Sequence, residues 1–213
     1  MPDSDNHSSG RLSFVAGPIG NLEDITYRAV RTLREADLIA AEDTRRARIL
    51  LQHYDISCKL VCYNKDNEGR RDASLVARVR DEGLHVALLA DAGTPCLSDP
   101  GYVLARHALE AGVELDVIPG PSALTYAVCA CGFPVSSFAF GGFLPRKSGK
   151  RKRRLAELAQ NRTFFVYESP YRIDKLLGEI CEVLGEETQV ALLREATKMH
   201  EEHRRGPAAE VLA

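Results

Sequence analysis

Residues 85–101 read HVALLADAGTPCLSDPG, an apolar segment followed by a polar one rich in turn-forming residues. The segment VALLA, Val86–Ala90, is apolar at every position and lacks the alternation of a strand with one solvated face. Such a run predicts a strand covered on both faces, as in the centre of a parallel sheet flanked by helices. Because Asp91 and a series of turn-forming residues follow directly, we expect a polar loop at the carboxyl end of this strand.

On both sides of this strand, apolar runs alternate with amphipathic ones, which is typical of an α/β fold with crossover helices. The amphipathic runs carry apolar residues at helical spacing, and Asp43 can cap one of them. We therefore expect an N-terminal domain with a five-stranded parallel sheet, its strands at residues 12–16, 38–41, 59–63, 85–90 and 114–118. The expected helices are 26–36, one that follows Asp43, 74–81, 102–111 and 123–131.

Composition changes after residue 132, where glycine, proline and phenylalanine accumulate in FPVSSFAFGGFLPRKSGK. We interpret this as an inter-domain crossing. The expected organisation is a disordered leader (1–11), an N-terminal α/β domain (12–132), a linker (133–149) and a C-terminal α/β domain (150–213). Only two clear strands, 163–167 and 189–194, fall in the second domain with the helix 171–184, so this domain is expected to be incomplete.

The composition is that of a globular protein, with 213 residues, 45% hydrophobic and 27% charged. No apolar run approaches the roughly 20 residues that span a bilayer, and the first residues lack the pattern of a signal peptide. The six cysteines are scattered rather than paired in CxxC motifs, which indicates reduced thiols and argues against a zinc site. We expect a cytoplasmic protein without a metal.

Charge is divided unequally along the chain. Residues 1–145 hold 14 Lys and Arg against 19 Asp and Glu, whereas residues 146–213 hold 14 against 11. Seven of the nine residues from Arg146 to Arg154 are basic, a density that attracts a polyanion. A solvated helix start would explain the same run. Because no aromatic residue is interleaved there, we expect contact with phosphates rather than with bases.

Ligands of an open parallel sheet bind outside the carboxyl ends of its strands, so the loops there are the candidate site. Four of these loops are unusual: AGPIGN (16–21), AEDTRR ending at Arg46, DAGTPCLSDPG (91–101) and PGPSALTYA (119–127). Asp91 is either a ligand-facing acid or the cap of its own loop. Together with the helix start at Ser122, these loops are typical of a site for a small zwitterionic cofactor.

The segments VAGPIGNLEDITYRAV, ALLADAGTPCLSDPG, VIPGPSALTYA, FVYESPYRI and LREATKMHEEHRRG occur in this order. In them the chain resembles the ribosomal RNA branch of the tetrapyrrole methylase superfamily, the class III methyltransferases. The resemblance implies methyl transfer from S-adenosylmethionine to the ribose 2′-hydroxyl of a cytidine in the decoding region of 16S rRNA. It also implies two α/β domains with the cofactor in the cleft between them, a homodimer, and a C-terminal domain that is truncated relative to the family.

The resemblance also carries cofactor-binding positions onto this chain. In the N-terminal domain they are Ile19, Asp91, Gly93, Thr94, Ser122 and Ala123, and in the second domain Glu168 and Ala196. Asp91 is expected to face the methionine part of the cofactor, and Glu168 and Ala196 to lie near the adenosine.

A ribose hydroxyl needs a proton acceptor to become a good nucleophile, and Glu42 is our hypothesis for that acceptor because it ends the second strand at the same rim as Asp91. Alternatives are Glu195 and Lys198, followed by His200 and His203, histidines that we expect to be exposed. The residues expected to contact RNA phosphates are Arg45, Arg46, Arg151, Lys152 and Arg153. Two rival functions remain open, methylation of a small molecule such as a tetrapyrrole and a non-catalytic RNA-binding module.

Overall fold

The computed structural model describes residues 10–213. This part of the chain forms two compact units that meet between Ser122 and Ala123. Residues 1–9 of the expected leader, 1–11, lie outside the described residues. Its last residue, Arg11, is the first residue of strand β1 (Arg11–Val15).

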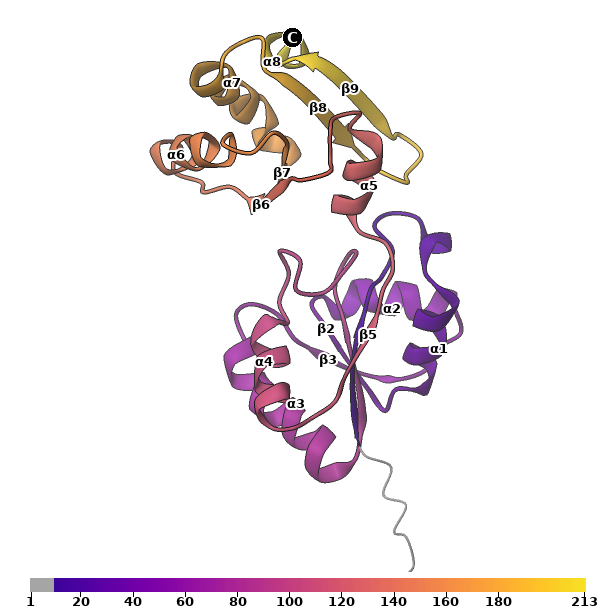
Figure 1. The fold of residues 1–213 in the computed structure, drawn as a ribbon. Coiled ribbons are helices and arrows are strands. Elements are labelled where there is room, and N and C mark those ends of the chain that lie inside the picture. The colour runs from indigo at the N-terminus through magenta and orange to yellow at the C-terminus, as the bar shows by residue number, and fades with distance from the viewer. Residues whose placement is uncertain (1–9) are drawn as a thin grey trace, which may run out of the picture. The chain divides into compact units, whose positions relative to one another are not determined.

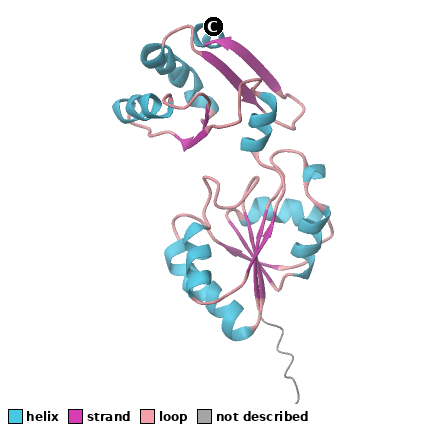
Figure 2. Ribbon diagram, in the orientation of Figure 1, coloured by secondary structure: helices cyan, strands magenta, loops and turns pink. Residues whose placement is uncertain are grey.

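The first unit is a parallel five-stranded sheet of order β3-β2-β4-β1-β5 with helices on both faces (Figures 1 and 2). This confirms the expected α/β class and the five-stranded sheet. Its strands are β1 (Arg11–Val15), β2 (Leu38–Ala41), β3 (Lys59–Cys62), β4 (His85–Leu89) and β5 (Leu115–Ile118). Its helices are the 3-10 turn η1 (Leu22–Asp24), α1 (Tyr27–Glu35), α2 (Thr44–His53), α3 (Glu68–Glu82) and α4 (Tyr102–Glu110).

Strand β4 is central and pairs with β1 on one side and β2 on the other. Val86 and Leu88 point into the core formed with α3 and α4, whereas Ala87 and Leu89 point into the core formed with α1 and α2. All four side chains are buried. The unbroken apolar run is therefore explained by two cores, one on each face of the sheet.

Local side-chain hydrogen bonds begin two of the helices. The Thr26 hydroxyl accepts from the backbone N–H of Ala29 at the start of α1, and the Asp43 carboxylate accepts from that of Arg45 at the start of α2. Helix α3 starts six residues earlier than expected, because the polar segment before Ser74 is also helical.

The second unit contains four strands and four helices among the described residues. They are α5 (Ala123–Ala130), β6 (Ala139–Phe143), α6 (Ser148–Leu158), β7 (Phe164–Tyr167), η2 (Pro170–Arg172), α7 (Ile173–Leu184), β8 (Gln189–Arg194), β9 (Glu202–Pro207) and α8 (Ala208–Leu212), η2 being a 3-10 turn. Strands β6 and β7 pair in parallel, and β8 and β9 pair antiparallel. A core of leucines with Ile180, Ala208 and Val211 packs between these strands and helices.

The division into units differs from the expected one. Helix α5 belongs to the second unit, and the segment expected to be a linker contains β6. Glycine and phenylalanine in AFGGF suggested a crossing, but this strand pairs with β7 across a register shift that accommodates Gly141 and Gly142. Strand β9, EHRRGP, was also missed, because its mostly charged side chains leave no apolar pattern on a strand that pairs only with β8.

Arg151 corrects the expectation that this residue contacts RNA. Its side chain is only 2% exposed, and its guanidinium donates to both carboxylate oxygens of Glu179 on α7, at 2.5 and 2.7 Å. Nη1 also donates to the carbonyl oxygens of Pro145 and Arg146. These hydrogen bonds hold the pKa of the Glu179 carboxyl below its ordinary value. Arg151 therefore joins α6, α7 and the preceding loop.

Within residues 10–213, no helix is both long enough and apolar enough to cross a membrane.

We predict that Arg151→Ala lowers the free energy of unfolding by about 3–5 kcal/mol, because it leaves the buried Glu179 carboxylate without its partner. Arg153→Ala, at an exposed position on the same helix, is the matched control and is expected to change stability by no more than about 0.5 kcal/mol. Urea unfolding followed by circular dichroism measures both variants. Equal stability of the two would contradict the structural role of Arg151.

Candidate functional site

Three loops at the carboxyl edge of the five-stranded sheet are joined by hydrogen bonds. The backbone N–H of Gly17 donates to the carbonyl of Gly93 at 2.9 Å, and the N–H of Gly93 donates to the carbonyl of Pro18 at 3.3 Å. The Thr94 hydroxyl donates to the carbonyl of Pro121 at 3.2 Å. The loops after β1, β4 and β5 therefore form one connected surface, which contains the expected positions Ile19, Gly93, Thr94 and Ser122. Ala123 begins α5, the first helix of the second unit.

Gly93 lies at the centre of this surface, with a φ of 74°. A Cβ at this position would be 3.2 Å from Cγ2 of Ile19, 3.4 Å from the carbonyl oxygen of Pro121 and 3.7 Å from the Cα of Ser122. Because Gly93 has no side chain, the loops after β1 and β5 can approach the loop after β4 closely. The three loops are therefore packed closely against one another around Gly93.

Asp91 connects the third loop to the second. Its Oδ1 accepts from the backbone N–H of Asp43 at 2.7 Å, and its Oδ2 lies 3.6 Å from Nη1 of Arg46. The carboxylate therefore accepts a hydrogen bond from the loop after β2. Neither expected role of Asp91, a ligand-facing acid or a cap of its own loop, included this contact. Its side chain remains 23% exposed beside the arginine.

Glu42 is half-buried at the same edge. Burial raises the pKa of its carboxyl, and the nearby carboxylates of Asp99 and Asp91 raise it further, while Lys65 and Arg46 lower it. Burial likewise raises the pKa of Asp99. Glu42 therefore lies in a cluster of three carboxylates balanced by two cations.

Sequence reasoning did not single out Asp99 or Lys65. The Lys65 ammonium donates to the carbonyl of Ser98 at 2.7 Å, so the loop after β3 is tied to the loop after β4. Cys96 and Ser98 both have φ near +70°, which turns this loop sharply back on itself. Asp99 could have been noticed as the aspartate in SDPG. No sequence pattern, however, predicts the turn that brings it near Glu42.

The candidate residues of the second unit have local partners. The Glu168 carboxylate is only 3% exposed and lies 2.5 Å from Nη2 of Arg172. Ala196 lies between Glu195 and Thr197, both with φ above +50°, in the loop between β8 and β9. Glu195 lies 3.3 Å from the ammonium of Lys198. Glu195 and Lys198, the two alternative proton acceptors, are therefore partners in one exposed ion pair.

Both histidines are exposed, as expected. Nε2 of His203 also lies 2.6 Å from the Tyr126 hydroxyl.

The remaining cations expected to bind RNA are accessible but paired. The side chain of Arg45 is 84% exposed and contacts Asp43 at 2.8 Å, and that of Arg46 is 68% exposed beside Asp91. Lys152 pairs with Glu182, whereas Arg153 is exposed and donates to the carbonyl of Gly149.

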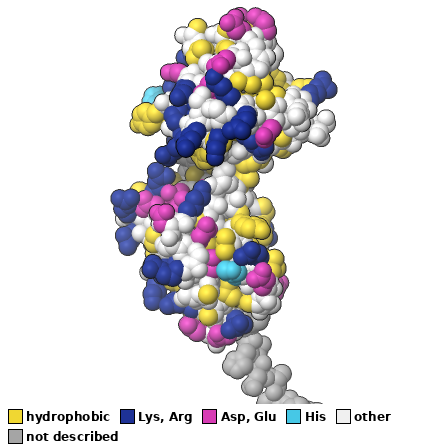
Figure 3. All heavy atoms as spheres, turned by 90° about the vertical axis from the view of Figure 1, so that its left-hand side faces the viewer, with side chains coloured by type: hydrophobic (Ala, Val, Ile, Leu, Met, Phe, Trp, Pro, Cys, Tyr) yellow, Lys and Arg dark blue, Asp and Glu magenta, His cyan; other side chains and the backbone are white. Residues whose placement is uncertain are grey.

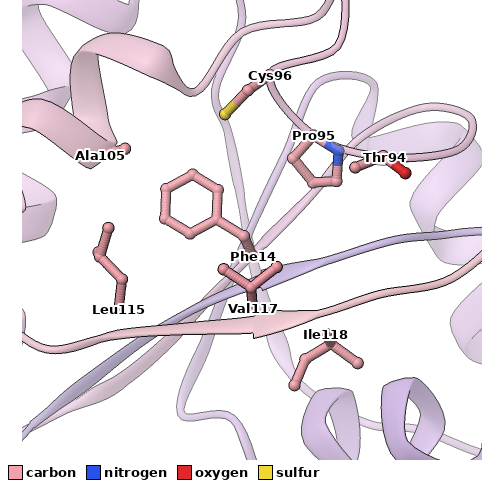
Figure 4. Close-up of a pocket in the computed structure, with 8 residues that line it drawn as sticks. All are labelled: Phe14, Thr94, Pro95, Cys96, Ala105, Leu115, Val117 and Ile118. Atoms are coloured by element: carbon pink, nitrogen blue, oxygen red, sulfur yellow. The ribbon is translucent and has the colours of Figure 1, made fainter. Parts of the chain in front are cut away.

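An apolar cavity of about 170 Å³ lies beneath the loop after β4 (Figure 4). Pro95 and Cys96 line it from above, with Phe14, Leu115 and Val117 from the sheet. No charged side chain lines it, and it is smaller than the roughly 300 Å³ of small-molecule sites. It therefore does not match the expected zwitterionic cofactor. Among the described residues, no group of three or more His, Cys, Asp or Glu side chains is arranged to hold a metal ion.

Sequence comparison identifies relatives over nearly the whole chain. The model of the family Tetrapyrrole (Corrin/Porphyrin) Methylases matches residues 11–212. Ribosomal RNA small subunit methyltransferase I of Thermotoga maritima is 47% identical over 206 residues, which cover 96% of this chain and 91% of the relative. The protein of the same name from Escherichia coli O157:H7 is 45% identical over 211 residues, covering 99% of this chain and 73% of the relative.

Solved structures share the fold at lower identity. A diphthine synthase superposes with a TM-score of 0.72 at 16% identity, covering 95% of this chain and 84% of that one. A cobalt precorrin-4 methyltransferase superposes with a TM-score of 0.69 at 16% identity, covering 99% of this chain and 90% of that one.

We predict that Gly93→Ala destabilises the protein by more than the roughly 1–2 kcal/mol of left-handed strain, because Ile19 must also move. Two controls separate these effects. Gly112→Ala has similar strain (φ 70°) in open space, and Gly69→Ala, in helix α3, has open space without that strain. The expected order of unfolding midpoints in urea is Gly69→Ala highest, then Gly112→Ala, then Gly93→Ala. A Gly93→Ala protein as stable as Gly112→Ala would refute the close approach of the loops.

Proposed function

Because the chain belongs to the tetrapyrrole methylase family, we propose that it transfers the methyl group of S-adenosylmethionine to the ribose 2′-hydroxyl of a cytidine in the decoding region of 16S rRNA. The observation that carries the proposal is the joined loop surface around Gly93, in a chain 47% identical to a ribosomal RNA small subunit methyltransferase I. This function implies a cytoplasmic location beside the small ribosomal subunit.

The loop surface fits the cofactor chemically. Ile19, Gly93, Thr94 and Ser122 are proposed to lie along the cofactor, with Gly93 serving by its shape because its N–H and carbonyl already bond the first loop. Asp91 offers a partly exposed carboxylate for the ammonium group. Glu168 and Ala196 of the second unit are proposed to contribute near the adenosine, Glu168 by its backbone because its carboxylate is already paired. When bound, S-adenosylmethionine supplies a methyl group attached to a positively charged sulfur.

Glu42 is the proposed proton acceptor. As the bond between the ribose oxygen and the methyl carbon forms and the carbon–sulfur bond breaks, its carboxylate takes the proton that the hydroxyl loses. The burial that raises its pKa also makes it a stronger base than an ordinary glutamate. Glu195 and Lys198 are weaker candidates, because each is the partner of the other.

Positioning of the RNA falls to exposed cations. Arg45 and Arg46 lie one turn beyond Glu42, so they are suited to hold phosphates flanking the target ribose. Lys152 and Arg153 retain this role in the proposal, whereas Arg151 does not, because its guanidinium is buried.

The test combines the full chain, S-adenosylmethionine with a labelled methyl group, and small ribosomal subunits that lack the modification. We expect label in 16S rRNA at one cytidine, and resistance of the adjoining phosphodiester to alkali because the 2′-oxygen is blocked. Light scattering of the active sample tests the homodimer that the resemblance implies. Labelling of a tetrapyrrole but not of the subunit would overturn the proposal in favour of the small-molecule function.

We predict that Glu42→Gln lowers the single-turnover rate of methyl transfer by about 10²–10⁴-fold, because the reaction loses its proton acceptor. Cofactor affinity, measured by calorimetry, is expected to stay unchanged. A full single-turnover rate in this variant would exclude Glu42 from the role.

The pH dependence provides a second test of the same carboxylate. Only ionised Glu42 accepts a proton, so the rate should fall as the pH drops through its pKa, which lies above the ordinary 4.5. Asp99→Asn removes a repelling charge and should move this fall to lower pH, whereas Lys65→Met removes an attracting charge and should move it to higher pH. Shifts in the same direction would contradict the assignment.

A further inference from the structure

The second unit has its own carboxyl sheet edge, formed by β6 and β7. These strands are parallel, so their last residues, Phe143 and Tyr167, lie at the same edge and are paired in register. Their rings are 5.5 Å apart in an edge-to-face arrangement. Helices α6 and α7 follow these strands, and their first turns therefore start from this edge (Figure 1).

Ion pairs set the position of α6 along α7. Ser148, the first residue of α6, donates to Glu179, which also binds Arg151, and Lys152 contacts Glu182 one turn further. Lys175 precedes Glu179 by four residues and lies on the same face of α7. The first turns of α6 are therefore held against the middle and the last turn of α7.

Two exposed aromatic side chains lie at the end of β6 and after β7. Tyr171 is 96% exposed, and Phe143 is 57% exposed. Tyr171 follows Pro170 in the 3-10 turn η2, whose next residue, Arg172, is anchored to the buried Glu168. An aromatic ring is thus presented to solvent from a backbone that is well fixed.

Cations follow both aromatic residues closely in the sequence, with Arg146 and Lys147 three and four residues after Phe143 and Lys175 four residues after Tyr171. Arg146, Lys147 and Lys150 at the start of α6 are exposed, as is Lys175 near the start of α7. Asp174 is an exposed acid within the same segments, so positive charge prevails. Figure 3 shows Lys and Arg side chains gathered densely on the second unit, in the upper part of the view.

We propose that Phe143 and Tyr171 form a stacking surface for unpaired bases of the RNA substrate, with the neighbouring cations holding its phosphates. This inference rests on the proposed function and adds to it a contact with bases, which the basic run alone did not indicate. Single-stranded RNA can bind an aromatic ring and a cation together, since each nucleotide has a planar base and a charged phosphate. The surface is expected to accept any base, because stacking uses the face of the base rather than its edge.

The test compares two single-stranded oligoribonucleotides of equal length, one of cytidines and one with abasic riboses, which carry the same phosphates. The full chain should bind the cytidine oligomer more tightly. Tyr171→Ala should reduce that preference about fivefold or more, and Tyr171→Phe should keep it, because the ring is retained. Tyr27→Ala is the matched control, since this tyrosine is 98% exposed on the first unit.

Salt dependence separates stacking from charge. Tyr171→Ala should leave the slope of log affinity against log salt unchanged, whereas Lys147→Ala should reduce its magnitude by about 0.7. A Tyr171→Ala protein that keeps the full preference for the cytidine oligomer would overturn the stacking surface. Failure of the proposed function has a different signature, namely absence of methyl transfer to the small subunit by the unaltered chain.

Discussion

The burial of β4 on both faces is the constraint on which the first unit depends. A strand without a solvated side must end at the sheet edge before a polar residue can follow, so Asp91 emerges where the carboxyl ends of β1 and β2 also lie. The loops then have little freedom, because Gly93 is hydrogen-bonded to the first loop through both its N–H and its carbonyl. The order and parallel direction of the strands alone therefore bring these loops to one edge of the sheet.

Two uses of charge follow from different degrees of burial. Arg151 and Glu179 are shielded from water, so each charge needs the other as its hydrogen-bond partner, and the pair joins helices α6 and α7. At the carboxyl edge of the first unit, Glu42 and Asp99 are only half-buried, and their repulsion is offset incompletely by Lys65. Removing one member of the buried pair would leave an uncompensated charge, whereas at the sheet edge burial and the neighbouring carboxylates raise the pKa of Glu42 above its ordinary value.

The first unit was predictable because its three central strands are buried and its helices amphipathic, and strand β2 has the expected bounds, Leu38–Ala41. Strand β9 was not, because a strand of charged residues is specified by its antiparallel partner β8 rather than by its own composition. The candidate site divides in the same way. Motif loops led to Gly93 and Asp91, whereas the burial of Arg151 depends on a glutamate 28 residues away, which no local pattern in a basic run reveals.

The division of charge between the units suits the two ligands of the proposed reaction. No charged residue lies between Asp116 and Arg146, so the excess of acids belongs to the first unit and the excess of bases to the second. S-adenosylmethionine carries a sulfonium and an ammonium against one carboxylate, and acidic loops favour such a cation. RNA is a polyanion that a cluster of carboxylates repels, so its attraction must come mainly from cations elsewhere. The excess of bases in the second unit, together with the exposed Arg45 and Arg46 at the acidic rim, supplies positive charge for the RNA of the proposed reaction.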